Sequence, residues 1–335
     1  MQPPYSITPE ILKLVESIGI SLGEINGRYL TKPAPHLRKE NRIRTIQASL
    51  AIEGNSLSLE QITAIVSGKR VIGPQREIVE VRNAIATYDQ LDSFDPYSAQ
   101  SFLSAHGILM KELVDDAGKF RRKSVGIMHG NKVAHIAPPA SSVKALMQEL
   151  LNYTKQAPDS MLIKSCVFHY EMEFIHPFMD GNGRMGRLWQ TLLLSKHHPV
   201  FSSLPFETII RYTQQDYYKA LAASDKLGQS TPFIAYMLGV IDDALQGLAQ
   251  DTPPVLKESD RIQYFLSLKN DGLDTRSPKT AARAESRAGF TRKDYMQVFK
   301  TLSTATASRD LNTAVKSGVL MRMGVGNQAR YGKKH

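Results

Sequence analysis

Apolar side chains recur every three or four positions along most of the chain, which is the period of an α-helix. The first such face consists of Ile11, Leu12, Leu14, Val15 and Ile18, behind the start signal Thr8-Pro9-Glu10. Further stretches of this period predict helices over residues 38–52, 98–114, 160–175, 183–196 and 232–248. Another helix follows the capping sequence Thr213-Gln214-Gln215-Asp216. The pattern therefore predicts a mainly α protein.

One stretch, from Val125 to Ile136, has a different period. Its apolar positions alternate with polar ones on both sides of the turn dipeptide Gly130-Asn131, which predicts a β-hairpin. A two-stranded hairpin by itself is marginally stable in water. We therefore expect this hairpin to lean on the helical core or to pair with a ligand strand.

The C-terminal residues form a further pattern, separated from the helices by the boundary signal Asp251-Thr252-Pro253-Pro254. Two short helices joined by a polar turn, then a hairpin centred on Gly324-Val325-Gly326, resemble a winged helix-turn-helix. Residues 255–335 hold 16 Lys and Arg against 7 Asp and Glu, so they carry +9 of the chain's net +10. This charge permits DNA contact through Arg309, Lys316, Arg322 and Arg330. We favour a structural or protein-binding role over sequence-specific DNA binding.

Composition places the chain among globular proteins, with 42% hydrophobic and 22% charged residues. Its one cysteine, Cys166, excludes an internal disulfide, and its apolar surroundings favour a core position. The N-terminus lacks the basic and apolar regions of a signal peptide, and the longest apolar run, 233–241, is too short to span a bilayer. We expect a cytoplasmic protein that does not contact membranes.

The candidate chemistry lies between the predicted helices 160–175 and 183–196. The connecting sequence is His176-Pro177-Phe178-Met179-Asp180-Gly181-Asn182-Gly183-Arg184-Met185-Gly186-Arg187. Gly181 and Gly183 let the backbone turn successive N–H groups toward one point, to which the following helix adds its positive end. Asn182 can donate to a phosphate oxygen, and Arg184 and Arg187 share a helix face. These residues predict a phosphate site.

Two more groups in the same sequence bring reactive chemistry to this phosphate site. Asp180 is a hard oxygen ligand, suited to hold Mg²⁺ against phosphates. His176 is the group in this stretch whose ordinary pKa lies near neutrality, so it can take a proton from an attacking hydroxyl.

The stretch resembles the motif of the Fic (filamentation induced by cAMP) family, His-Pro-Phe-x-Asp/Glu-Gly-Asn-Gly-Arg-x-x-Arg, and matches it at every defined position. Fic proteins are mainly helical, and most transfer AMP from ATP to a Tyr, Ser or Thr hydroxyl of a target protein. The resemblance implies a general base (His176), a Mg²⁺ ligand (Asp180), a cradle for the α- and β-phosphates (Gly181, Asn182, Gly183) and two arginines for the β/γ end (Arg184, Arg187). The related Doc kinases carry Lys at the place of Gly183 and bind the nucleotide reversed, so Gly183 favours adenylyl transfer.

A second resemblance lies at the end of the predicted helix 38–52. Ser49, Glu53 and Gly54 match the family's inhibitory motif, Ser/Thr-x-x-x-Glu-Gly/Asn. Read without the family, Glu53 is a surface carboxylate at a helix end. The resemblance implies instead that Glu53 pairs with Arg187 and occupies the γ-phosphate site.

Two further site assignments come from the family. Tyr218 matches a tyrosine that lines the adenine pocket, with Asp225 a weaker candidate for an adenine hydrogen bond. The hairpin resembles the flap that adds the target's backbone as a strand, which would use Val125, Ile127, Val133 and His135.

We therefore expect a Fic helical core with a small β-hairpin flap and a C-terminal winged helix-turn-helix domain. The expected domains are an N-terminal helical region with the inhibitory helix (residues 1–94), the catalytic core (95–254) and the winged helix-turn-helix module (255–335). The expected function is an autoinhibited, Mg²⁺-dependent protein adenylyltransferase that uses ATP on an unidentified target, with homodimers and self-modification left open. The alternatives are a related Fic chemistry, such as phosphoryl transfer or removal of AMP, and a DNA-binding regulator with a degenerate enzyme core.

Overall fold

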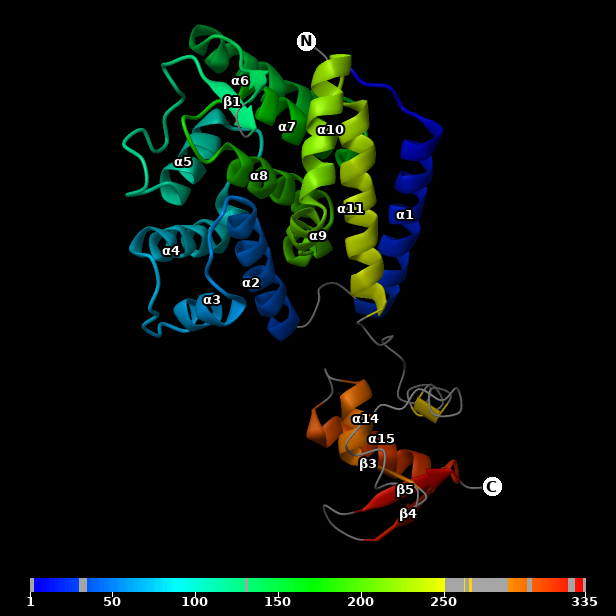
Figure 1. Cartoon of the computed structure of the whole chain (residues 1–335). Helices are drawn as coiled ribbons and strands as arrows, with labels where there is room; N and C mark the ends of the chain where they lie inside the picture. Colours follow the sequence, from blue (N-terminus) through cyan, green and yellow to red (C-terminus); the bar gives the residue numbers. More distant parts are fainter. Residues whose placement is uncertain are drawn as a thin grey trace. The chain divides into compact units, whose positions relative to one another are not determined.

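The computed structural model describes residues 3–29, 35–129, 132–250, 262, 265–266, 289–299, 303–324 and 329–333, which fall into two compact units (Figure 1). The first unit comprises Met1–Glu24 and Thr31–Leu248, and the second Ile25–Leu30 and Ala249–His335. Most described residues are helical, as the periodicity predicts. No helix within the described ranges is long and apolar enough to cross a membrane.

The first unit is built from helices and one hairpin, and the last residues of its first and last helices, from Ile25 and from Ala249, are grouped with the second unit. In chain order its elements are α1 (Pro9–Tyr29), α2 (Pro35–Ile52), α3 (Leu59–Val66), α4 (Gln75–Asp89), η1 (Leu91–Ser93), α5 (Ala99–Leu109), β1 (Gly126–His129), β2 (Lys132–Ile136), α6 (Ala140–Gln156), α7 (Met161–Ile175), α8 (Asn182–His197), η2 (Pro199–Ser203), α9 (Phe206–Tyr212), α10 (Gln214–Leu227) and α11 (Thr231–Gln250).

Helices α7 and α8 form the centre of this unit, and both are buried on nearly every face. A helix that is apolar all round has to be covered by other elements. Trp189 of α8 and Phe102 of α5 meet edge to face, with ring centroids 4.9 Å apart. Phe102 also stacks on Phe178 of the α7–α8 loop at 5.4 Å, so the core extends directly under that loop.

Two sequence predictions at helix ends are wrong. The helix predicted over 98–114 ends at Leu109, because Glu112 adopts a left-handed φ of 62° in the turn that follows. Thr213 precedes α10, but its hydroxyl donates to the Ile209 carbonyl instead of capping α10. The end of α2 is as predicted, since Gly54 has φ 93° and closes the helix.

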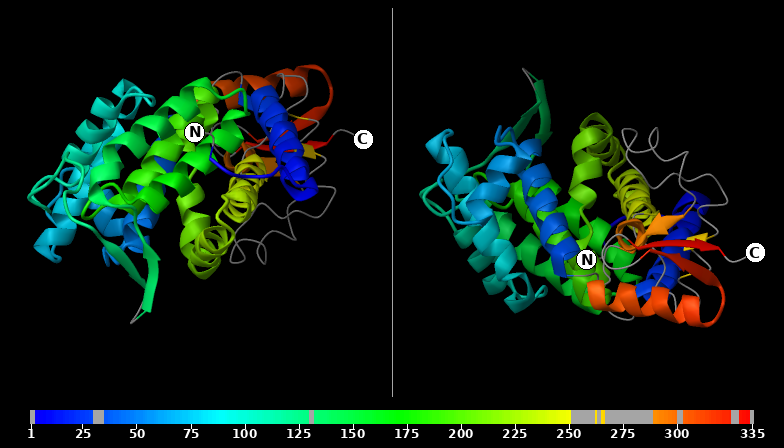
Figure 2. Two further views of the ribbon diagram at one scale, coloured as in Figure 1. Left: turned by 90° about the horizontal axis from the view of Figure 1, so that it is seen from above. Right: turned by 90° about the horizontal axis from the view of Figure 1, so that it is seen from below.

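The hairpin stands out from the helical body in the views from above and below (Figure 2). Its strands pair antiparallel, with Ile127 opposite His135 and Met128 opposite Val133, and an irregularity between Ile127 and Met128. The predicted turn, Gly130-Asn131, lies outside the described residues.

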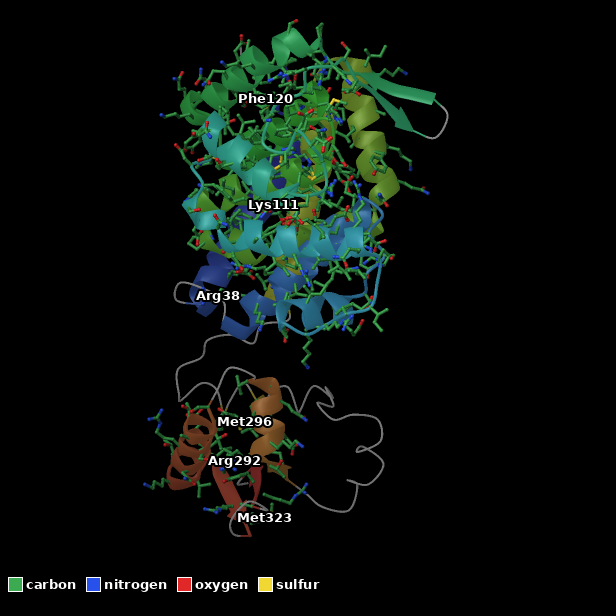
Figure 3. The ribbon with its side chains drawn as sticks, turned by 90° about the vertical axis from the view of Figure 1, so that its left-hand side faces the viewer. Arg38, Lys111, Phe120, Arg292, Met296 and Met323 are labelled. Carbon is green, nitrogen blue, oxygen red and sulfur yellow. The ribbon has the colours of Figure 1, made fainter. Side chains whose placement is uncertain are left out.

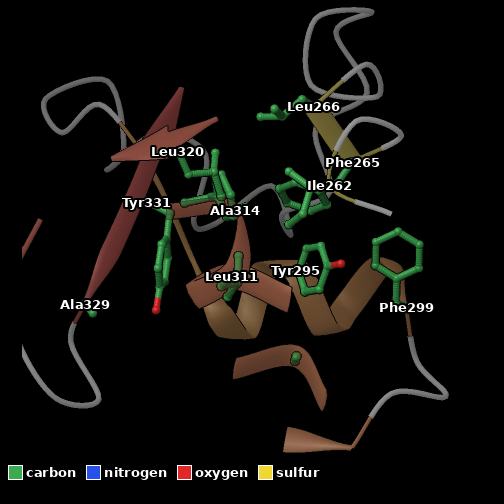
Figure 4. Close-up of a cluster of buried hydrophobic side chains, with 12 residues drawn as sticks. Ile262, Phe265, Leu266, Tyr295, Phe299, Leu311, Ala314, Leu320, Ala329 and Tyr331 are labelled. Carbon is green, nitrogen blue, oxygen red and sulfur yellow. The ribbon is translucent and has the colours of Figure 1, made fainter. Parts of the chain in front are cut away.

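The second unit contains β3 (Phe290–Thr291), α14 (Arg292–Val298), α15 (Thr304–Lys316), β4 (Leu320–Met323) and β5 (Arg330–Lys333). Strand β5 lies between β3 and β4 and is antiparallel to both. The apolar core of the second unit contains side chains from both helices and the sheet, including Tyr295, Leu311, Leu320 and Tyr331 (Figure 4). The winged helix-turn-helix interpretation stays a prediction, because residues 325–328 and most of 260–268 lie outside the described part.

Candidate active site

The predicted reactive residues lie on the loop that joins α7 to α8. His176 ends α7 in the left-handed conformation, with φ 50° and ψ 61°, and its N–H donates to the Met172 carbonyl at 2.9 Å. A left-handed histidine costs free energy and persists only where its surroundings hold it. The loop is therefore shaped by contacts outside His176 itself.

Asn182 supplies one of these contacts from the start of α8. Its side-chain Oδ1 accepts from the Phe178 N–H, and its Nδ2 donates to the Phe178 carbonyl, both at 3.0 Å. Asn182 is 3% exposed and Phe178 is fully buried. The amide predicted to bind phosphate thus holds the loop closed in this structure, and its phosphate role stays a prediction.

His106 of α5 holds the other side of the loop, a role that the sequence did not predict. Its Nδ1 accepts from the Gly118 N–H at 2.9 Å, so its Nε2 carries the proton and donates to the Asp180 carbonyl at 3.0 Å. The imidazole stacks flat on Phe178, with centroids 3.6 Å apart. Burial lowers its pKa to about 4, which keeps this tautomer neutral. A polar residue on an otherwise apolar helix face was the available sequence signal.

Asp180 lies at the accessible edge of the loop. Its Oδ1 accepts from the Gly181 N–H at 2.6 Å and from Arg184 at 2.9 Å. Arg184 also lies 3.5 Å from Glu80 of α4, and Arg76 lies 3.6 Å from the second Asp180 oxygen. Gly181, with φ 87°, immediately precedes α8, and a Cβ on it would lie 2.7 Å from the Met110 sulfur. A side chain at position 181 would therefore be strained by the left-handed backbone and would require Met110 to move.

Arg187 lies one turn further along α8 and is completely buried. Its Nε donates to the Ser49 hydroxyl at 3.0 Å, and its Nη2 donates to the Ser49 carbonyl at 3.0 Å and to Glu53 Oε1 at 2.7 Å. Burial opposes the charge on Arg187, but Glu53, Tyr217 and Glu173 together outweigh it and raise the pKa of the guanidinium. The ion pair implied by the family resemblance is therefore present.

Gly183 is what lets the Glu53 carboxylate approach α8. A Cβ on Gly183 would lie 2.5 Å from Glu53 Oε1 and 3.1 Å from Arg187 Nη1. Within the described residues, Nη1 is buried without a hydrogen-bond partner. Because Nη1 is a charged donor without a partner and Gly183 has no side chain beside it, a second anionic oxygen could bind there.

Glu173 of α7 is a further acidic group that interacts electrostatically with Glu53 and Arg187. Among the described residues its buried Oε1 has no hydrogen-bond partner. A Cβ on Gly186 would lie 3.0 Å from this oxygen and 3.0 Å from His169 Nε2. Burial and the Glu53 charge raise the pKa of Glu173 to about 8, although Arg187 acts the other way. Glu173 is therefore mostly protonated at neutral pH, and the sequence did not predict it.

Tyr218 lies near the Glu53 end of α2. Gln214 donates to the Ile52 carbonyl at 2.9 Å and to the Tyr218 hydroxyl at 3.2 Å. Its neighbour Tyr217 is the buried member of the pair, with its hydroxyl 3.1 Å from His169 Nε2. Asp225, two turns beyond Tyr218, accepts from the Tyr170 hydroxyl at 2.9 Å. The structure thus brings Tyr218 close to the Glu53 turn, while an adenine contact remains a prediction.

Of the predicted hairpin residues, Ile127 lies in β1, Val133 and His135 lie in β2, and Val125 immediately precedes β1. Their backbones are described, and the side chains of the three strand residues lie outside the described part. Arg121, which precedes the hairpin, contacts the carbonyl of His176 and was not predicted. No sequence signal pointed to it, because it lies among other basic residues of a loop, Lys119, Arg122 and Lys123, and such residues usually face solvent.

Asp180 could bind a Mg²⁺ ion if phosphate oxygens of a bound nucleotide supplied further ligands. The described residues contain no group of three or more His, Cys, Asp or Glu that could hold a metal by themselves. Mg²⁺ commonly takes one or two carboxylates and completes its shell with phosphate oxygens and water. The Asp180 side chain is 41% exposed, so a carboxylate oxygen is accessible for this purpose.

Comparisons with known proteins show the family to which the chain belongs. A profile of the Fic/DOC family matches residues 96–194. The chain is 41% identical to a Fic family protein from Desulfovibrio desulfuricans G20 of known crystal structure, with a TM-score of 0.69 over 99% of this chain and 98% of the other.

Protein adenylyltransferases are also among the similar proteins. Fic-1 of Caenorhabditis briggsae is 29% identical over 60% of this chain and 40% of its own length. The Drosophila melanogaster enzyme Fic is 25% identical over 72% of this chain and 50% of its own length. The chain thus spans half or less of these two relatives.

Proposed function

Because the chain belongs to the Fic/DOC family, we propose that it is a protein adenylyltransferase that moves AMP from ATP to a hydroxyl of a target protein and is held at rest by Glu53. Relatives that are named protein adenylyltransferases support the reaction class. The observation that carries the proposal is the anion already bound at the start of α8, where Glu53 Oε1 lies 2.7 Å from Arg187. A site built to hold a carboxylate there can hold a phosphate.

The phosphates are assigned to the first turns of α8. Its free N–H groups and positive end attract anions, and Arg187 offers Nη1 beside Gly183. Arg184, freed from Asp180, would bind the same end of the nucleotide. Asp180 would hold Mg²⁺, which when bound neutralises charge on the departing pyrophosphate.

His176 is assigned the proton transfer. In the reaction the hydroxyl oxygen of the target forms a bond to the α-phosphorus, and the bond from that phosphorus to the oxygen of the β-phosphate breaks. Pyrophosphate leaves, and the hydroxyl proton passes to His176. The Nδ1 atom of His176 is shut off from solvent, so we assign the proton to Nε2. Placement of the hydroxyl and the base accounts for most of the rate that the protein has to supply.

Inhibition follows from the burial of Arg187. Its side chain is fully buried, whereas Glu53, which is paired with it at 2.7 Å, is 33% exposed. A γ-phosphate that approaches Arg187 has to displace the Glu53 carboxylate, because the two negative charges repel at short range in a partly dry pocket. ATP would then bind with its phosphates displaced from the in-line geometry, and transfer would be slow.

The test uses the Glu53→Gly variant, in which no carboxylate competes for Arg187. The variant is incubated with Mg²⁺ and with ATP labelled at the α- or the γ-phosphate, and modified proteins are identified by mass spectrometry in a cell lysate and in the variant itself. We expect label from the α-phosphate and a mass increase of one AMP. Label from the γ-phosphate instead would mean phosphoryl transfer and would contradict the proposal.

Two substitutions separate the assigned roles. His176→Ala should lower transfer by about 10² to 10⁴ and leave ATP affinity nearly unchanged, because it removes a base and no phosphate donor. Asp180→Ala should lose activity together with its response to Mg²⁺. An Asp180→Ala variant that still titrates normally with Mg²⁺ would exclude Asp180 as the ligand.

A further inference from the structure

Arg121 joins the segment before the hairpin, the segment after it and the end of α7. Its Nε donates to the His176 carbonyl at 2.7 Å and its Nη2 to the Ile175 carbonyl at 3.2 Å. Its Nη1 donates to the Lys123 carbonyl at 2.8 Å, and Nη2 also donates to the Pro138 carbonyl at 2.5 Å. The Arg121 side chain is buried, and its backbone N–H donates to the Pro177 carbonyl at 2.8 Å. One guanidinium therefore satisfies four carbonyl oxygens.

Two of these carbonyls lie at the end of α7, one on Ile175 and one on His176, the candidate base. The last carbonyls of a helix have no partner within the helix, and the negative end of the helix dipole favours a cation. Within the described residues no carboxylate forms an ion pair with Arg121. The charge of Arg121 is therefore balanced by the helix end, and its bond to His176 restrains the left-handed backbone that carries the imidazole.

The other two carbonyls, of Lys123 and Pro138, lie just before and just after the hairpin. Lys123 lies three residues before β1, and Pro138 lies two residues after β2. Phe120, which is labelled in Figure 3 and immediately precedes Arg121, lies 5.8 Å between ring centroids from Phe178 of the same loop. Both ends of the hairpin are thus tied to the segment that bears His176.

We propose that Arg121 is a positioning residue that fixes the β1–β2 hairpin relative to His176, so that a protein strand bound along the hairpin brings its hydroxyl to the base. This inference rests on the proposed function for the roles of the hairpin and of His176. It adds to that function a residue, Arg121, whose contacts would explain how a protein hydroxyl is placed accurately at the base. Water needs no hairpin to reach the base, so Arg121 matters more for a protein acceptor than for hydrolysis of ATP.

The fork of donors makes arginine difficult to replace. A lysine ammonium has three donors on one atom and cannot span carbonyls that lie on both sides of a planar guanidinium. Arg121→Lys therefore keeps the positive charge but loses the simultaneous hydrogen bonds to the α7 end and to both ends of the hairpin. Arg122 is the matched control because it is the next residue, is exposed and has the same charge.

The experiment compares Arg121→Lys and Arg122→Lys, each combined with Glu53→Gly in the full chain. We expect Arg121→Lys to lower self-adenylylation about 10- to 100-fold, since small misplacements of reacting groups have effects of this size. ATP hydrolysis to AMP and pyrophosphate should fall less, and ATP affinity should stay within twofold, because Arg121 touches none of the phosphate-binding residues. Arg122→Lys should change none of these quantities.

Amide hydrogen exchange provides a readout that does not depend on activity. Arg121→Lys should speed exchange in β1, in β2 and at the His176 and Phe178 amides together, and Arg122→Lys should speed exchange at none of them. If Arg121→Lys transfers AMP at the rate of its parent, or if transfer, hydrolysis and ATP affinity fall in parallel, the positioning role is wrong. If the parent transfers no AMP from ATP, the proposed function fails, and the exchange data still decide whether Arg121 links hairpin and loop.

Discussion

The ion pair between Glu53 and Arg187 combines two effects at the scale of single residues. It neutralises a fully buried guanidinium, and it fills the place assigned to a terminal phosphate. Burial makes the first effect large, because a buried charge without a partner is costly. Under the proposed function, Glu53 would therefore contribute to stability and oppose activity through the same contact.

Replacing Glu53 should separate these effects. We expect Glu53→Gly to raise the initial rate of AMP transfer severalfold or more, Glu53→Asp to raise it less, and Ser49→Ala, which removes one hydroxyl from Arg187, to give a smaller gain. Rates with α-labelled ATP at equal Mg²⁺ provide the measurement. The gain should vanish when His176→Ala is added. Equal rates for wild type and Glu53→Gly, with ATP bound in both, would leave Glu53 as a helix-end carboxylate.

Gly183 offers an independent test of the same contact by a double-mutant cycle. Glu53→Gly should destabilise the resting protein, because removing one partner of a buried ion pair costs about 3–5 kcal/mol and partial exposure of Glu53 reduces this figure. In a Gly183→Ala background the cost should shrink, since the added methyl group has already displaced the carboxylate. Denaturant unfolding of the four proteins measures the coupling. Additive free energies of unfolding would mean that Gly183 does not make room for Glu53.

Glu173 predicts a pH dependence of stability. Its folded pKa of about 8 lies above the ordinary value of 4.5, so the folded state binds a proton that the unfolded state releases between those pH values. For this group, stability falls as pH rises from 4.5 toward 8, by at most about 1.4 kcal/mol per pH unit. Glu173→Gln removes this loss, so it should stabilise the protein more at pH 8 than at pH 5.5. Thermal unfolding at both pH values checks the difference, and an equal effect at each would contradict the shifted pKa.

At the scale of elements, the α7–α8 loop is held by side chains from neighbouring segments. Asn182 closes it from α8, His106 supports the Asp180 carbonyl from α5, and Arg121 holds its start. Each bond ends on a loop backbone atom. The reactive side chains thereby stay accessible while the backbone that carries them is fixed.

His106→Phe tests this arrangement. Phenylalanine keeps the stacking on Phe178 but leaves the Asp180 carbonyl and the Gly118 N–H without their partners. An unsatisfied buried group costs about 1–3 kcal/mol, so we expect a lower melting temperature and a lower rate of AMP transfer in the Glu53→Gly background. His197, which is exposed, is the control position for a His→Phe change. Unchanged stability and rate in His106→Phe would show that the loop does not depend on this support.

At the scale of the whole molecule, the two units divide chemistry and charge. Every candidate catalytic residue lies in the first unit, whereas the C-terminal residues carry most of the net positive charge. In the described part of the second unit, Asp294 caps α14 and Asp310 is buried against the Tyr295 hydroxyl at 3.0 Å. Arg309 and Lys316 of α15 are exposed.

Truncation tests the division. A chain that ends at Pro254 should retain measurable Mg²⁺-dependent AMP transfer, although its choice of target can change. The full chain should bind random DNA duplexes weakly and lose them steeply as salt rises, because a basic surface attracts any polyanion. Tight binding to one DNA sequence at physiological salt would overturn the structural or protein-binding role that we favour for residues 255–335.

The sequence by itself determined the helical class, the hairpin and the loop with the candidate chemistry. Helical and strand periods arise from local backbone geometry, and a short motif keeps its catalytic groups within a few residues of each other. His176, Asp180 and Arg187 could therefore be found without a structure. The family resemblance added the Glu53 pairing, which the residues around Glu53 did not reveal.

The tertiary structure decided which side chains support that loop and which ones interact with Arg187. His106, Arg121 and Glu173 come from other helices or loops, and their partners are backbone carbonyls or buried charges that leave no pattern in the sequence. It also gave Gly183 its clearance role, because the Glu53 carboxylate comes from 130 positions earlier in the chain. Contacts of this kind depend on how helices pack, and packing follows from the shape and burial of the whole core rather than from local spacing.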